Sequence, residues 1–379
     1  MTIPYGHQWV DENDISAVAD VLYSDWLTTG PKVEEFEATF ADFIGVKEAV
    51  AVSSGTAALH AAMYALGIEP DDEVIVSPMT FAATANSVIF QGGIPVFADV
   101  NSETLLIDPM QVEAKITPAT KAIIAVDYAG QPCDYDALQD IADRRDLILI
   151  ADACHALGAQ YSGRNVGTLA DLSTFSFHPV KHISTGEGGM ITTDNPDFAR
   201  RMRIFRNHGI TTDHHQREEQ GSLFYEMVDL GFNYRLTDIQ CALGISQMKK
   251  LPKFLDRRHE IAGYYDSAFA EFPEIVPLSV RQGVLHSYHL YVVRIDFGAL
   301  NIDRTKLFME LREKGIGVNV HYVPVHLHPY YRQKFHTGPG LCPVAERAYE
   351  QILSLPIFPG MTDDDVNSVI TTVGNLIKT

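Results

Sequence analysis

The chain has 379 residues, of which 46% are hydrophobic and 21% charged, and its formal net charge is −20 at pH 7. This length suits two domains with a sizeable core, and the composition is that of an ordinary globular protein. The acidic balance argues against nucleic acid and anionic membranes as partners, because both require a positive face. We therefore expect an acidic cytoplasmic protein.

The sequence carries no signal for secretion or membrane insertion. The first residues, MTIPYGHQWVDENDI, have neither the basic nor the apolar region of a signal peptide. No uncharged apolar run approaches the roughly 20 residues that a spanning helix requires. The cysteines are scattered without a CxxC pair, so we expect reduced thiols and no zinc site. They are Cys133, Cys154, Cys241 and Cys342.

Short β-rich runs alternate with helical patterns from about residue 49 to residue 200. The run AVAVS at 49–53 is typical of a buried strand, and an apolar helix follows it and ends at Gly67. Further strands are expected at 73–77, 94–100, 121–128, 147–152, 173–177 and 189–193, and helices at 82–91 and 134–145. Apolar strands separated by helices predict an α/β fold with a mostly parallel sheet that is covered on both faces.

The pattern changes after about residue 250. A long helix is expected over 257–272, β-rich runs at 290–295 and 316–323, and helices at 303–314, 343–353 and 362–377. We therefore predict a large domain over residues 1–250 and a smaller C-terminal α/β domain over residues 251–379.

The segment SFHPVKHISTGEGG (176–189) contains a lysine, Lys181, between an expected strand and a Gly-rich stretch. A lysine at such a place can project into a site. To form a Schiff base its amine must be partly deprotonated, which burial or a nearby cation favours. The alternative is a surface lysine that follows a strand, as most lysines are exposed.

A second segment, IADACHALGA (150–159), has Asp152 at the end of an expected strand. In α/β sheets ligands bind beyond the carboxyl ends of the strands. A carboxylate there can pair with the protonated ring nitrogen of pyridoxal phosphate (PLP), which keeps the ring an electron sink. The alternative is an N-cap for the turn that follows, since Asp is a common cap.

A third segment, SSGTAAL (53–59), joins a strand to a helix. Free N–H groups at a helix N-terminus, together with hydroxyls, predict a phosphate cradle, although ordinary capping uses the same residues. The chain contains neither GxxxxGK[ST] nor GxGxxG. Phe81, in PMTFAATANS, is either a core aromatic or a ring that stacks on a cofactor. The cradle, the acid and the lysine occur in the order that a PLP site would use.

These segments, with LGFNYRLTDIQCALG, closely resemble the fold-type I sugar aminotransferases of the DegT/DnrJ/EryC1/StrS group over nearly the whole chain. The resemblance implies an aspartate aminotransferase-like fold, PLP as cofactor and a homodimer with shared active sites. Within the group, WLTTGP (26–31) and VHYVPVHLHPYY (320–331) look most like the pseudaminic acid pathway members. Those members transfer an amino group from glutamate to C4 of a UDP-linked 4-keto-6-deoxy-N-acetyl sugar, of the altro configuration.

The resemblance also implies a role for each matching residue. Lys181 would form the Schiff base and act as general acid and base, and Asp152 would pair with the pyridine nitrogen. Phe81 matches the ring-stacking position, and His155 matches a residue beside the phenolic oxygen of the cofactor. The implied phosphate ligands are Gly55, Thr56, Ser176 and, from the neighbouring subunit, Asn233. The implied substrate contacts are Tyr5, Trp26, Leu27, Thr28, Thr29, Ser54, Val320, His321, Tyr322 and Val323.

Several alternatives remain open at this stage. Another keto-sugar nucleotide, such as a dTDP-4-keto or dTDP-3-keto hexose, is the main rival substrate. Relatives that dehydrate sugars carry histidine in place of the lysine, which argues against dehydration here. A non-catalytic PLP-binding regulator would need neither Lys181 nor Asp152. The His-containing loop TTDHHQREEQGSLFYE (211–226) has no assignable role, and we expect no metal there.

Overall fold

The computed structural model describes residues 2–212 and 224–378. Its main feature is a seven-stranded sheet with the strand order β1-β9-β8-β5-β4-β2-β3. The strands are β1 (Glu48–Val52), β2 (Glu73–Val76), β3 (Ile94–Phe97), β4 (Thr120–Val126), β5 (Ile148–Asp152), β8 (Leu172–Ser176) and β9 (Gly189–Thr193). The strands from β8 to β3 pair in parallel, and β9 is antiparallel to both β1 and β8. The prediction of a mostly parallel sheet is confirmed.

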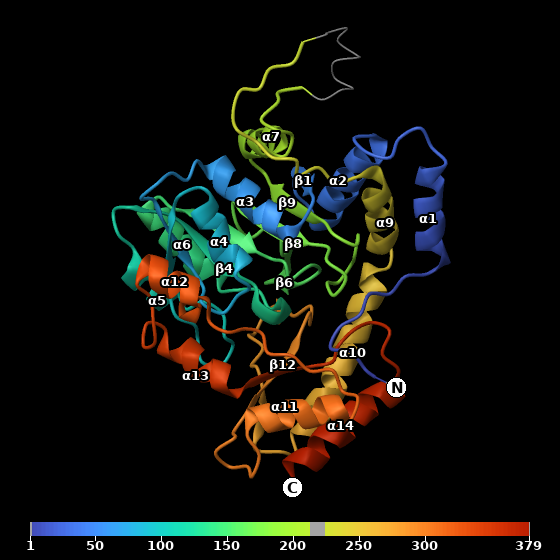
Figure 1. The fold of residues 1–379 in the computed structure, drawn as a ribbon, viewed down its shortest axis with the longest axis vertical. Helices are drawn as coiled ribbons and strands as arrows, with labels where there is room; N and C mark the ends of the chain where they lie inside the picture. The colour runs from blue at the N-terminus through green and yellow to red at the C-terminus, as the bar shows by residue number, and fades with distance from the viewer. Residues whose placement is uncertain (1, 213–223, 379) are drawn as a thin grey trace.

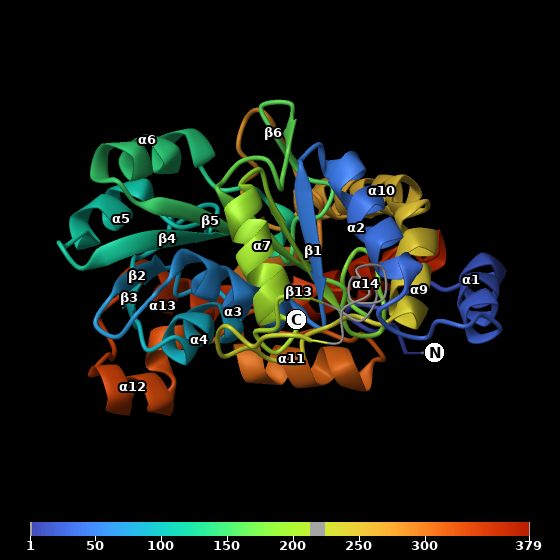
Figure 2. The same cartoon turned by 90° about the horizontal axis from the view of Figure 1, so that it is seen from above.

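Helices cover both faces of this sheet. Figure 2 shows α5 (Pro109–Lys115) and α6 (Tyr135–Arg145) on one side of β4 and β5, and α3 (Gly55–Leu66) and α4 (Ala83–Phe90) on the other. Helix α3 is apolar around most of its circumference because it contacts β8 and β9 on one side and α4 and α7 (Pro196–Phe205) on others. It ends at Gly67, whose φ of +76° suits glycine, as predicted.

Further helices frame the two ends of the chain. Helix α1 packs against α9 at one edge of the molecule, and α9 leads into the long helix α10 (Figure 1). Helix α10 begins earlier than expected because Pro252 suits the first turn of a helix. The bounds are α1 (Glu12–Leu22), α2 (Pro31–Ile44), α9 (Asp238–Met248), α10 (Leu251–Phe269), α12 (Pro329–Phe335) and α13 (Pro343–Gln351).

The C-terminal region surrounds a smaller antiparallel sheet with the order β10-β12-β13. Figure 1 shows α11 and α14 beside it, below the large sheet. Its hydrophobic cluster is separate from the main core and includes Ile3, because the N-terminal segment crosses to this region. The Ile3 N–H donates to Gly315 O at 2.8 Å, and the Gly317 N–H donates to Ile3 O at 2.7 Å. The elements are β10 (Ile275–Pro277), β12 (Tyr291–Ile295), α11 (Arg304–Glu313), β13 (Ile352–Leu355) and α14 (Asp363–Ile377).

One secondary-structure prediction in this region is wrong. Among the described residues, 316–323 form no regular strand and pair through isolated bridges at Ile316 and Asn319, because this stretch turns along a cavity. The helix expected near 343–353 is confirmed, but it ends at Gln351, and the strand β13 follows. Leu355 precedes Pro356, and a residue before proline avoids the helical conformation, which favours the strand.

A small third sheet combines β6 (Gln160–Tyr161), β7 (Arg164–Asn165) and β11 (Val284–Leu285) and links the two regions. The domain boundary at residue 250 stays a prediction. Within the described residues, no helix is both long and apolar enough to cross a membrane.

Candidate active site

A cavity of about 540 Å³ lies at the edge of the large sheet where β1, β5 and β8 end. Parallel strands present their carboxyl ends at one edge, so residues distant in the sequence meet there. The predicted residues that line the cavity are Tyr5, Ser54, Gly55, Thr56, Phe81, Asp152, His155, Ser176, Lys181, Val320, His321 and Tyr322.

Asp152 precedes β8 in the sequence and Lys181 follows it, but both line the same cavity. Asp152 is the last residue of β5, and Lys181 belongs to the segment that follows β8. Burial lowers the pKa of the Lys181 amine, and the nearby Cys154 and Asp152 oppose part of that shift. A lowered pKa increases the fraction of neutral amine, which is the nucleophilic and proton-accepting form.

The turn between β1 and α3 has unsatisfied backbone donors. Ser54 caps the helix by accepting from the Ala57 N–H at 3.1 Å. Among the described residues, the N–H groups of Gly55 and Thr56 have no acceptor, as is expected in a first helical turn. A Cβ added to Gly55 would lie 2.8 Å from Ser176 Cβ, so only glycine lets this turn approach the end of β8. The arrangement can hold a phosphate.

His155 and Phe81 line the same cavity. The His155 Nε2 lies 3.0 Å from the Tyr322 hydroxyl, and burial, followed by the charge of Lys181, holds the His155 pKa well below its ordinary value. The imidazole is therefore neutral near pH 7. Phe81 is 63% exposed, which excludes a core aromatic, and its ring centroid lies 6.2 Å from that of Tyr322.

Some predicted residues do not line the cavity within one chain. Thr28 forms an isolated bridge with Thr237, and Asn233 is exposed and bridges to Asn207. The predicted residues outside the cavity are Trp26, Leu27, Thr28, Thr29, Val323 and Asn233. Residues 213–223 of the loop 211–226 lie outside the described residues.

Several cavity residues were missed by the sequence analysis. Thr84 donates to Asp152 Oδ2 at 2.6 Å, and the Sγ of Cys154 would lie 3.2 Å from a Cβ on Gly55. Thr84 lies within the motif MTFAATAN, but no local signal shows that it faces a residue 68 positions later. The other missed lining residues include Thr80, His178, Glu187, His289 and Asn319.

The residues present fit PLP. The cavity volume is within the range of about 300–1,000 Å³ that is typical of small-molecule sites. A phosphate suits the free N–H groups of Gly55 and Thr56, a pyridinium nitrogen suits the carboxylate of Asp152, and an aldehyde suits the amine of Lys181. Each reactive part of the cofactor therefore has a chemically matched group.

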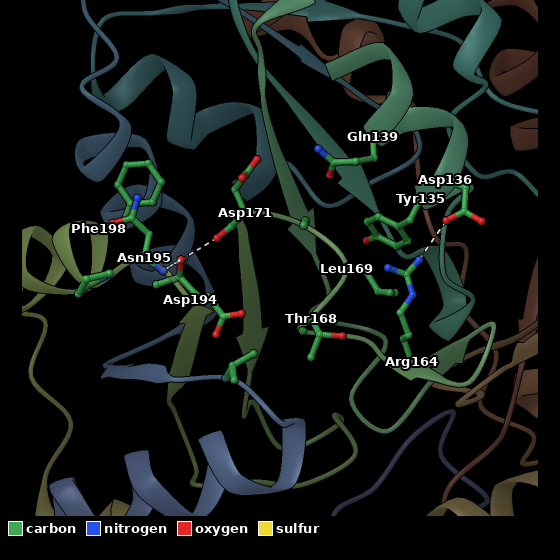
Figure 3. Close-up of a pocket in the computed structure, with 15 residues that line it drawn as sticks. Tyr135, Asp136, Gln139, Arg164, Thr168, Leu169, Asp171, Asp194, Asn195 and Phe198 are labelled. Atoms are coloured by element: carbon green, nitrogen blue, oxygen red, sulfur yellow. Dashed lines mark hydrogen bonds and ion pairs between the residues drawn. The ribbon is translucent and has the colours of Figure 1, made fainter. Parts of the chain in front are cut away.

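A second cavity, of about 660 Å³, lies at the opposite edge of the sheet (Figure 3). Asp171 precedes β8 there, and Asp194 follows β9. Arg164 points toward Asp136, with 3.0 Å between Nη2 and Oδ1, so the charges of both residues are satisfied within the protein. No lysine is among the residues that line this cavity, and the helices that begin beside it are capped by the side chains of Asp134 before α6 and Asn195 before α7, so we assign it no catalytic role.

Asp127, one strand away from Asp152, gives a prediction about stability and pH. Its Oδ1 accepts from the Cys133 N–H and the Tyr135 hydroxyl, both at 2.9 Å, and burial raises its pKa from 3.8 to about 7. The neutral acid is favoured in the folded state, so its stabilising contribution is full below pH 3.8 and is lost as pH rises through about 7.

We expect the stability of Asp127→Asn relative to the wild type to increase as pH rises across this interval, by up to about 1.4 kcal/mol per unit. Urea unfolding at a series of pH values measures this difference. Asp143→Asn, on the exposed face of α6, is the control and should show no such trend. A pH-independent difference for Asp127→Asn would contradict the prediction.

Known proteins resemble this chain along its whole length. The DegT/DnrJ/EryC1/StrS aminotransferase family matches residues 8–374. The spore coat polysaccharide biosynthesis protein SpsC of Bacillus subtilis is 42% identical over 378 residues, which are 99% of this chain and 97% of that protein. The uncharacterized protein MJ1066 of Methanocaldococcus jannaschii is 45% identical over 370 residues, which are 97% of this chain and 96% of that protein.

Solved structures share the fold. Spr1654 of Streptococcus pneumoniae, described as a sugar aminotransferase, superposes in its PMP-form with a TM-score of 0.94 at 34% identity, covering 99% of each chain. Its PLP-form gives a TM-score of 0.93 at 34% identity and covers 100% of this chain and 99% of that one. PseC of Helicobacter pylori, an aminotransferase of pseudoaminic acid biosynthesis, gives 0.92 at 33% identity and covers 100% of both chains.

Proposed function

The chain belongs to the DegT/DnrJ/EryC1/StrS aminotransferase family and is a PLP-dependent sugar aminotransferase, and we propose that it transfers the amino group of L-glutamate to C4 of a UDP-linked 4-keto-6-deoxy-N-acetyl sugar. Glutamate leaves as 2-oxoglutarate, and the keto sugar leaves as a 4-amino sugar. The reaction would serve the biosynthesis of a pseudaminic acid-type sugar.

The observation that carries the catalytic part of this proposal is the convergence of three chemical groups on one cavity. The amine of Lys181, the carboxylate of Asp152 and the N-terminus of α3 reach it from three separate strand ends. A scaffold protein would need neither a lysine of lowered pKa nor a buried acid at this place.

Each group has a distinct task in the proposed reaction. PLP, when bound, supplies an electron sink for the negative charge left on carbon when a proton departs. Lys181 removes the α-proton of glutamate, and in the second half-reaction it delivers a proton to C4 of the sugar. Asp152 holds a proton on the pyridine nitrogen, and the Gly55 and Thr56 N–H groups bind the phosphate.

The choice of sugar rests on similarity. WLTTGP, SFHPVKHISTGEGG and VHYVPVHLHPYY resemble the pseudaminic acid pathway members, and PseC is among the solved structures that superpose on this chain. SpsC, by its name, also belongs to polysaccharide biosynthesis. A dTDP-4-keto or dTDP-3-keto hexose is the competing substrate.

Spectroscopy of the two half-reactions tests the proposal. L-glutamate should abolish the absorbance of lysine-linked PLP, and the matching keto-sugar nucleotide should restore it. The reverse reaction, run with a panel of 4-amino and 3-amino sugar nucleotides carrying UDP or dTDP, identifies the sugar. Fastest conversion of the UDP-linked 4-amino-6-deoxy-N-acetyl sugar is the expected result. A dTDP-linked sugar that reacts faster would overturn the substrate assignment. An absorbance that does not change on addition of L-glutamate would overturn the assignment of glutamate as the amino donor.

We also propose that two copies of the chain complete each site, with Asn233 binding the phosphate in the partner's cavity. The neighbouring Phe232 and Tyr234 rings both contact His60, with centroids 5.1 and 5.9 Å away. Alternation along an extended segment then directs the Asn233 side chain outward. Large apolar side chains nearby are exposed, including Phe224 at 84% and Leu230 at 71%, and exposed apolar patches of this kind mark protein interfaces.

Mixed dimers test this shared site. Lys181→Ala and Asn233→Ala subunits, co-expressed, should form hybrids with one intact site, in which Lys181 of one subunit meets Asn233 of the other. Random pairing should then restore about a quarter of the wild-type turnover. Co-expression of Lys181→Ala with Asp152→Asn is the control, and it should restore nothing because both groups belong to one chain's cavity. Equal outcomes for the two mixtures, with hybrids present, would contradict the shared site.

A further inference from the structure

Two buried threonines form a hydrogen-bonded chain that ends on the catalytic acid. The Thr84 hydroxyl lies 2.6 Å from Asp152 Oδ2, and the Thr80 hydroxyl lies 2.7 Å from that of Thr84. Both side chains are nearly inaccessible, at 3% for Thr80 and 1% for Thr84. Such short contacts in a buried place are stronger than their equivalents in water.

The direction of each hydrogen bond follows from the number of protons available. An ionised carboxylate only accepts, so the single hydroxyl proton of Thr84 is committed to Asp152. Thr80 must then donate to Thr84. Both hydroxyl dipoles of this hydrogen-bonded chain therefore point toward Asp152 Oδ2. The other carboxylate oxygen, Oδ1, accepts a longer bond of 3.3 Å from the Cys154 N–H, and the Cys154 thiol also bonds to this carboxylate. Thr84 is therefore the closest protein donor to the carboxylate.

The backbone at Thr84 is itself held on both sides. The Thr84 N–H donates to Phe81 O at 3.2 Å, and the Ser87 hydroxyl donates to Thr84 O at 2.7 Å. The β-branched side chain of threonine also has few rotamers in a helix, so its hydroxyl keeps its direction. Phe81, which lines the mouth of the cavity, belongs to the same turn. One short segment thus supplies both Phe81, which would face the cofactor ring, and Thr84, which holds Asp152.

We propose that Thr84, supported by Thr80, is a positioning residue that holds the Asp152 carboxylate oriented toward the cofactor ring nitrogen. This inference rests on the role proposed for Asp152, and it is independent of the identity of the sugar. Without the Thr84 donor, the carboxylate loses its strongest protein partner and gains rotational freedom, so it binds the pyridinium less well.

Substitutions that separate the hydroxyl from the shape of the side chain test the proposal. Thr84→Val keeps the branched shape and removes the donor, whereas Thr84→Ser keeps the donor. We expect Thr84→Val to weaken the binding of PLP to the apoprotein about tenfold or more, as for the loss of a hydrogen bond to a charged group. Thr84→Ser should restore most of the affinity. Titration of the apoprotein with PLP, without any sugar, measures both.

Thr192→Val is the matched control, because it makes the same substitution at a buried threonine of β9 that donates to Gly167 O at 3.1 Å and does not line the cavity. It should lower stability as much as Thr84→Val and leave the PLP affinity unchanged. Thr80→Val should weaken PLP binding less than Thr84→Val does. The double variant should lose little more affinity than Thr84→Val alone, because both residues act through the one bond to Asp152. Thr80→Val also serves as the test if Thr84→Val fails to fold.

The cofactor spectrum gives a second readout that general destabilisation would not change. The absorbance of lysine-linked PLP should titrate at a different pH in Thr84→Val, because ring charge and imine protonation are coupled, and Thr84→Ser should return it to the wild-type value. Unchanged PLP affinity and an unchanged titration in Thr84→Val would overturn the proposal. Equal losses of PLP affinity in Thr84→Val and Thr192→Val would also overturn it. A wrong sugar assignment would leave all these measurements intact.

Discussion

Lys181→Ala should abolish turnover and remove the absorbance of lysine-linked PLP. The substitution deletes both the amine that binds the cofactor covalently and the group that carries the proton, and alanine supplies neither. Loss of a general acid–base group alone costs up to about 10⁴-fold in rate. We therefore expect turnover to fall at least about 10⁴-fold, as measured by 2-oxoglutarate release with a saturating keto-sugar nucleotide.

Two comparisons make this result specific. Lys121→Ala, which removes an exposed lysine whose Nζ lies 3.9 Å from Asp72 Oδ1, should keep the absorbance and the turnover. Lys181→Arg keeps a positive charge in the cavity but not a nucleophilic amine, and it should remain inactive. Wild-type turnover in either Lys181 variant would refute the assignment of the lysine.

Asp152→Asn should lower turnover while leaving Lys181 attached to the cofactor. The amide has nearly the shape of the carboxylate, but it carries no charge to hold a proton on the ring nitrogen. Loss of a preorganised electrostatic partner typically costs a hundredfold to a thousandfold in turnover, and we expect roughly that range. The loss should appear in the single-turnover rate with glutamate, while the absorbance of lysine-linked PLP persists.

The persistence of this absorbance distinguishes the two catalytic residues. Asp171→Asn, in the cavity at the opposite edge of the sheet, changes the same functional group far from Lys181. It should therefore react with glutamate at the wild-type rate. If Asp152→Asn also kept the wild-type single-turnover rate, the carboxylate would have no part in the chemistry.

The sequence was sufficient to predict those site residues whose position depends on the secondary structure of the neighbouring residues. Asp152 ends a strand and Gly55 begins a helix, and both positions follow from the change of hydrophobic pattern at those points. Since carboxyl ends of parallel strands share an edge, their meeting in one cavity also follows from the predicted sheet.

Contacts between distant segments could not be obtained in this way. Tyr5 reaches the cavity only because the N-terminal segment packs against residues 315–317, and the sequence contains no periodicity that announces this. The bond from Thr84 to Asp152 depends on the rotation of α4 over the sheet, which side-chain packing determines. Residues 316–323 alternate between apolar and polar side chains as a strand does. Their backbone nevertheless pairs with neighbouring segments through isolated bridges, at Ile316 and Asn319.

The position of β1 at the end of the sheet has a consequence for synthesis on the ribosome. Among the strands of the described residues it pairs with β9 alone, with Glu48 opposite Thr193 and Val52 opposite Gly189. The turn after β1 rests directly on β9, since a Cβ on Gly189 would meet Ser54 O at 2.4 Å. Pairing over so long a separation forms late. We therefore expect PLP to be retained only after β9 has left the ribosome, because the turn that would bind its phosphate rests on that strand.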